Sequence, residues 1–282
     1  MKKKFFLMLA GCLLALVSTM NAATIADIVI VVDESGSMAG EHAWLPGMVN
    51  SLSTKLAGLG YTANFGLIGY GNGISGSNNG RMLLNAGTAA QFATAAGSLV
   101  VSGGTEDGYA GINYASSNYT FTGGSARNYI LVTDEDRDVT TGDTFASMST
   151  LLSGQSALLN AVVDNAFGCT GGGTGSVIGR TTGNGYRVGA GGTYTACSTP
   201  TTGAGFGTTG PDYVTLALGT KGAGWNLNIL RNGGNDAASF TAAFVDIKVA
   251  EIVTQTGVPE PASYLLGGSA LVGFALLRRR KR

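Results

Sequence analysis

Histidine is nearly absent from this chain of 282 residues, which contains only His42. Charged residues are also scarce, at 12%, and the 17 Lys and Arg residues balance the 17 Asp and Glu residues. The sequence has no HExxH, GxSxG or P-loop motif, so the usual machinery of metalloproteases, serine hydrolases and nucleotide-binding enzymes is missing. We therefore expect a protein that is not an enzyme and does not bind nucleic acid.

Cysteine is equally rare, and the first of only three, Cys12, lies in the leader. Three lysines precede an apolar run from Phe5 to Val17, and small residues follow up to Ala22. This order predicts a secretory signal peptide over residues 1–22. An alternative stays open, because Leu9-Ala10-Gly11-Cys12 resembles a lipobox in which Cys12 would be lipidated.

The other two cysteines, Cys169 and Cys197, lie in a segment rich in Gly and Thr, residues 168–211. In an exported protein, two remaining cysteines most simply form one disulfide. CxxC spacing is missing, which argues against a metal role. We expect a disulfide-tied insertion of short strands and turns here.

Outside that segment, apolar runs alternate with amphipathic stretches. Strands are predicted at residues 28–32, 63–70, 81–84, 128–133, 158–163 and 225–230, and helices at 41–59, 88–99, 105–116, 143–154 and 238–253. Residues 213–218 fit a strand or a short helix. The alternation predicts an α/β fold, with a doubly wound, mostly parallel sheet and helices on both faces.

Oxygen-bearing side chains follow two of these strands. Asp33, Ser35 and Ser37 come directly after the first strand, and Asp134 follows the strand 128–133. Thr105 lies in a Gly-Gly-Thr turn that should open at the same edge, because ligands of doubly wound sheets bind beyond the carboxyl ends of the strands. Carboxylate and hydroxyl oxygens suit a hard divalent cation, with Mg²⁺ or Ca²⁺ as the leading candidates.

These pieces, in this order, resemble a von Willebrand factor A (VWA) domain that carries a metal-ion-dependent adhesion site. The resemblance covers residues 24–256, with the segment 168–211 as its main departure. It implies that Ser35 and Ser37 contact the metal (Mg²⁺, or Ca²⁺ or Mn²⁺) through their hydroxyls. It further implies that Thr105 binds directly or through water, that Asp33 and Asp134 bind mostly through water, and that one position stays open for a partner's carboxylate.

The end of the chain combines three features. Pro259-Glu260-Pro261 precedes an apolar segment, residues 264–277, and a basic cluster closes the chain. Residues 257–282 resemble the PEP-CTERM sorting signal of Gram-negative bacteria, which implies processing by an exosortase-type enzyme. The segment 264–277 would anchor the protein transiently in the inner membrane, with the basic cluster on the cytoplasmic side.

Two functions follow as expectations. The first is an exported surface or matrix protein that grips an acidic group of a protein or polymer through the divalent cation. The second is a structural component of the extracellular matrix in which the metal only stabilises the fold. Of the remaining acidic residues, Glu34, Glu106 and Asp107 are expected to be solvated loop charges, and His42 a surface residue near the site.

Overall fold

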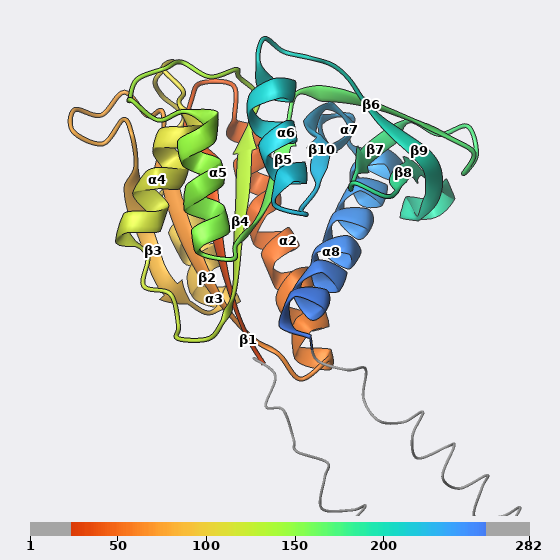
Figure 1. The fold of residues 1–282 in the computed structure, drawn as a ribbon, viewed down its shortest axis with the longest axis horizontal. Helices are drawn as coiled ribbons and strands as arrows, with labels where there is room; N and C mark the ends of the chain where they lie inside the picture. Colours follow the sequence, from red (N-terminus) through yellow and green to blue (C-terminus); the bar gives the residue numbers. More distant parts are fainter. Residues whose placement is uncertain (1–23, 258–282) are drawn as a thin grey trace, which may run out of the picture.

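The computed structural model describes residues 24–257, which surround one ten-stranded sheet (Figure 1). Its order is β3-β2-β1-β4-β5-β10-β7-β8-β9-β6. The five strands β2, β1, β4, β5 and β10 run parallel, and β3 is antiparallel at the edge. The bounds are β1 Ile25–Asp33, β2 Thr62–Tyr70, β3 Arg81–Gly87, β4 Ala126–Thr133, β5 Leu158–Val163, β6 Asn165–Thr170, β7 Val177–Arg180, β8 Gly185–Val188, β9 Tyr194–Gly205 and β10 Gly224–Asn226.

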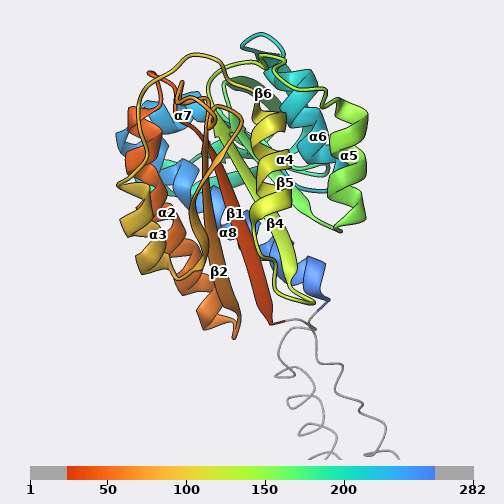
Figure 2. The same ribbon diagram turned by 90° about the vertical axis from the view of Figure 1, so that its left-hand side faces the viewer.

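Helices cover both faces of the sheet, as Figure 2 shows with the sheet between two helical layers. One layer consists of α2 (Ala39–Gly58), α3 (Ala89–Ala96) and α8 (Gly234–Thr256). The other consists of α4 (Gly108–Asn118), α5 (Phe145–Gly154) and the continuous helical stretch η2 (Gly210–Val214) and α6 (Thr215–Gly219). This arrangement confirms the predicted doubly wound α/β fold.

The apolar run of β1 explains why both faces are covered. Ile28, Ile30 and Val32 pack into the core beneath α2 and α8, whereas Val29 and Val31 pack beneath α4. All five side chains are fully buried. Because successive side chains of a strand point to opposite faces, an uninterrupted β-branched run requires an apolar layer on each side.

Three local predictions needed correction. The helix expected from Thr105 begins at Gly108, because the Asp107 carboxylate accepts the backbone N–H of Tyr109 and caps that helix. The strand expected over 225–230 ends at Asn226, whose side chain accepts the N–H of Asn228 and starts α7 (Leu227–Arg231). The undecided segment 213–218 is helical.

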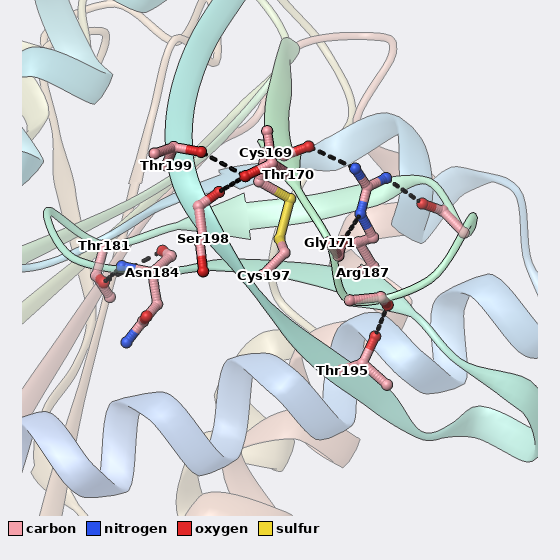
Figure 3. Close-up of a disulfide and its surroundings, with 12 residues drawn as sticks. Cys169, Thr170, Gly171, Thr181, Asn184, Arg187, Thr195, Cys197, Ser198 and Thr199 are labelled. Carbon is pink, nitrogen blue, oxygen red and sulfur yellow. Dashed lines mark hydrogen bonds between the residues drawn. A yellow bond between two sulfur atoms is a disulfide. The ribbon is translucent and has the colours of Figure 1, made fainter.

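The Gly- and Thr-rich segment folds as predicted into short strands and turns, which extend the central sheet beyond β10. The disulfide between Cys169 and Cys197 is confirmed, and it joins β6 to β9 (Figure 3). Beside it, the Arg187 guanidinium donates to the carbonyl oxygens of Cys169, Gly171 and Gly175 at 2.6–2.9 Å. A single cation thus holds together a loop that has few side chains of its own to pack.

Both ends of the described chain lie at the amino edge of the sheet (Figures 1 and 2). Near the end of α8, the Gln255 amide donates to the carbonyls of Arg127 and Ser156, which lie beside the starts of β4 and β5. Within residues 24–257, no helix is both long and apolar enough to cross a membrane. The predicted signal peptide, the sorting motif and the apolar segment 264–277 lie outside the described residues.

Candidate metal centre

Asp33, the last residue of β1, lies at the carboxyl edge of the sheet and is fully buried. Its Oδ1 accepts the backbone N–H of Ser35 at 2.7 Å, and its Oδ2 accepts the Thr133 hydroxyl at 2.8 Å. The His42 ring contacts the Asp33 carbonyl oxygen through Nε2 at 2.8 Å and is buried, so the expected surface position of His42 was wrong. The Asp33 carboxylate is therefore held in one orientation from two neighbouring strands.

A continuous chain of hydrogen bonds leads from this carboxylate to Asp134. The hydroxyls of Ser35 and Ser37 lie 3.2 Å apart, and the Ser37 hydroxyl donates to Asp134 Oδ1 at 3.0 Å. Ser35 is buried, whereas Ser37 is exposed. The polar turn after β1 and the residue after β4 thus meet at one point, and Ser37 faces the solvent there.

Thr105 lies close to this cluster without joining it. Its carbonyl oxygen accepts the Asn78 amide at 3.3 Å and lies over Gly71, as Asp33 Oδ1 also does. Within the described residues, the Thr105 hydroxyl forms no hydrogen bond with Asp33, Ser35, Ser37 or Asp134. Four of the five predicted ligands are therefore connected, and the fifth is exposed on an adjacent loop.

Glu106, which was expected to be a solvated charge, is buried next to Asp33 over Gly71. Burial, followed by repulsion from Asp33 and three other carboxylates, raises the pKa of Glu106 to about 8. Burial also raises the pKa of Asp33 to about 7, against the hydrogen bonds from Ser35 and Thr133. Buried carboxylates crowded in this way are stabilised in their charged form by a nearby cation.

The cation nearest to this cluster is Arg231, at the end of α7. Its Nη2 donates to Asp134 Oδ2 at 2.8 Å, and its Nε donates to Glu41 Oε1 at 2.5 Å. Burial opposes the charge of Arg231, but the hydrogen bonds to Glu41 and Asp134 raise its pKa above the ordinary value. Glu41 is buried, and its other oxygen, Oε2, has no hydrogen-bond partner.

Sequence reasoning did not find Arg231 or Glu41, since both appeared to belong to unrelated segments. The residues Glu34 and Asp107 were also misplaced as solvated charges. Glu34 is buried and paired with Arg81, whose Nε donates at 2.8 Å, and Asp107 is buried and paired with Arg137 at 2.7 Å. The hydrogen bond from Arg137 holds the pKa of Asp107 below its ordinary value, although burial acts in the opposite direction.

The donor set fits a hard divalent cation. Asp33, Ser35, Ser37 and Asp134 offer only carboxylate and hydroxyl oxygens, and the guanidinium on Asp134 occupies the place of a positive charge there. Among residues 24–257, no group of three or more His, Cys, Asp or Glu side chains is arranged to hold a metal ion. Any ion at this edge would therefore depend on the two serine hydroxyls.

The end of the chain can be compared with a known family. Residues 257–281 match the PEP-CTERM protein-sorting motif, which confirms the predicted C-terminal signal. This motif indicates an exported protein of a Gram-negative bacterium that is transiently anchored in the membrane, and it implies processing by an exosortase-type enzyme. No curated protein sequence matches the chain.

Several solved structures are similar in fold. An aerotolerance-related membrane protein from Bacteroides fragilis shares 15% identity, over 80% of this chain and 99% of that one, with a TM-score of 0.47. The pilus adhesin SpaC from Lactobacillus rhamnosus GG shares 16% identity, over 84% and 31%, with a TM-score of 0.48. The SpRpn10 VWA domain shares 12% identity, over 49% and 74%, with a TM-score of 0.37.

Proposed function

We propose that this protein is an exported binding protein of the VWA type, which uses one divalent cation to grip an acidic group on a protein or matrix polymer. The observation that carries the proposal is the hydrogen-bonded chain from Asp33 through Ser35 and Ser37 to Asp134. It brings oxygen ligands from two distant segments to one solvent-facing point.

The residues would divide the task as follows. Ser35 and Ser37 would hold the cation through their hydroxyls, while Asp33 and Asp134 orient those hydroxyls and balance the charge. Thr105 would join from its exposed loop. A bound Mg²⁺, or Ca²⁺ or Mn²⁺, would supply the electrophilic vertex that a partner's carboxylate can fill.

Ser37→Ala is the most direct test. Ser37 is exposed, so its loss should leave the fold intact while removing the hydroxyl between Ser35 and Asp134. We expect Mg²⁺ binding, measured by calorimetry, to weaken about tenfold or more for the loss of one ligand. Ser51→Ala removes an equally exposed hydroxyl from α2 and serves as the matched control.

Adhesion to the native matrix should follow metal binding. We expect the protein to be retained on matrix in Mg²⁺, released by EDTA, and poorly retained as Ser37→Ala. Retention that ignores both the chelator and the substitution would refute the proposed function.

The ion pairs of Arg231 favour a second candidate, a structural matrix component in which a metal only stabilises the fold. Because Arg231 already neutralises Asp134, the cluster has a counter-charge of its own. This candidate predicts a melting temperature that falls in EDTA, together with matrix retention that does not change. Release from the matrix by EDTA at a temperature where the protein stays folded would exclude it.

A further inference from the structure

A second cavity lies at the opposite, amino edge of the sheet. Its volume is about 700 Å³, within the range typical of small-ligand pockets, and it is enclosed by α5, α6, α8 and the β7–β8 hairpin. Hydroxyl side chains dominate its wall. They are Ser149, Ser153, Ser156, Thr181, Thr220 and Thr254.

Two wall residues, Ser156 and Lys221, adopt left-handed backbone conformations, with φ of 52° and 69°. Each follows a helix, α5 or α6, at the position where glycine is strongly favoured. The chain places glycine at the equivalent position after α8, where Gly257 has φ of 62°. A non-glycine residue in this region costs about 1 kcal/mol, and such strain collects at binding sites.

Glu251 contributes an acceptor to the same wall. Its side chain is 8% exposed, and its Oε2 accepts both the Asn160 amide at 2.7 Å and the Lys248 ammonium at 3.1 Å. Its Oε1 is buried with no hydrogen-bond partner. A buried unpaired oxygen is uncommon in a native protein and needs an explanation. Asn160 is itself fixed by the indole N–H of Trp225 at 2.8 Å, so this acceptor is rigidly held.

The charge around the cavity favours a particular ligand chemistry. The carbonyl ends of α5 and α6 and the Glu251 carboxylate make the wall electron-rich, which disfavours an anion. Hydroxyl groups both donate and accept hydrogen bonds, so a wall of hydroxyls is complementary to a ligand of the same kind. We propose that this cavity binds a neutral sugar, one of whose hydroxyls donates to Glu251 Oε1 while Ser156 and Lys221 contact the ring substituents.

The two strained residues make a sharp test, because their replacement by glycine should affect folding and binding in opposite directions. Ser156→Gly and Lys221→Gly each relieve a left-handed side-chain conformation and should raise the melting temperature. Each also removes a hydrogen-bonding side chain from the wall, and we expect sugar binding to weaken about tenfold for each. Ala86→Gly relieves the same strain in β3, away from the cavity, and should raise the melting temperature without changing binding.

Binding is measured on the full chain by saturation-transfer NMR and titration. The probes are the methyl glycosides of glucose, galactose and N-acetylglucosamine, their disaccharides, and glucuronic acid as the charged comparison. EDTA is present throughout, so the result does not depend on the candidate metal centre. We expect saturation transfer to at least one neutral sugar and weaker binding of glucuronic acid. The proposal is overturned by no transfer to any neutral probe, by tighter binding of glucuronic acid, or by equal binding to the wild type and both glycine variants.

Discussion

Replacing Arg231 with methionine should strengthen divalent-cation binding at the carboxyl edge. The guanidinium holds Asp134 Oδ2 at 2.8 Å, and this oxygen belongs to the predicted ligand set. A bound cation must therefore compete with Arg231 for Asp134. Methionine keeps an unbranched side chain of similar length next to Met38, whose sulfur lies 3.9 Å from Arg231 Nη2.

The size of the effect follows from the exposure of this ion pair. A hydrogen bond between charged groups contributes about 1.5–3 kcal/mol when well buried. The Arg231 side chain is 32% exposed, so solvent screening reduces the contribution to about 1–2 kcal/mol. This range corresponds to a dissociation constant for Mg²⁺ or Mn²⁺ that is about 5- to 30-fold lower in Arg231→Met.

Calorimetric titration of both proteins with Mn²⁺ measures the change directly. Arg127→Met is the matched control, since it removes the same charge at the start of β4, at the amino edge of the sheet. Metal-free Arg231→Met should also melt at a lower temperature than the wild type, because Glu41 is left buried without its partner. Equal dissociation constants in the wild type and Arg231→Met would refute competition for Asp134.

Three further predictions concern the rest of the fold. Gly222→Ala should destabilise the protein by about 1–3 kcal/mol in urea unfolding, since its new Cβ would lie 1.8 Å from a main-chain oxygen, whereas Gly47→Ala, in open space within α2, should stabilise it by about 0.5–1 kcal/mol; the opposite ranking would contradict this packing. Replacing Cys169 and Cys197 together by serine should cost about 3 kcal/mol and leave Mg²⁺ affinity unchanged, and a changed affinity would show coupling between the two regions. Burial lowers the pKa of Lys248 below 10.5, despite the opposing effect of Glu251, so the unfolded chain binds more protons above the folded-state pKa. Stability relative to Lys248→Met should therefore rise as the pH increases toward 10.5, and a pH-independent difference in unfolding free energy would count against it.

The layers of the fold were predictable because they depend on local patterns. The β-branched run before Asp33 can only be a strand buried on both faces, and the helices show their apolar stripes in sequence. Asp33, Ser35 and Ser37 lie within five residues, and Asp134 follows a strand that is equally apolar. The meeting of these side chains then follows from the rule that parallel strands end at one edge.

The remaining parts of the site were not predictable, because their partners are distant in sequence. Arg231 reaches Asp134 from 97 residues away and Glu41 from 190. Its position depends on α7, which replaced an expected strand once Asn226 capped a helix. Glu34 looked like a solvated turn residue until its partner Arg81, 47 residues further on, came to lie beside it. No local pattern marks such pairs.

The exit point of α8 determines how the molecule would be displayed. Gln255 binds the carbonyls beside the starts of β4 and β5, so the sorting tail leaves from the side opposite Asp33 and Ser37. While the tail is held in a bilayer, the serine hydroxyls would face outward, toward neighbouring cells or polymers. The hydroxyl-lined cavity, whose wall includes Gln255, would face the lipid headgroups instead. Cleavage of the tail would then free the inner side of the protein for contact without changing what the outer side presents.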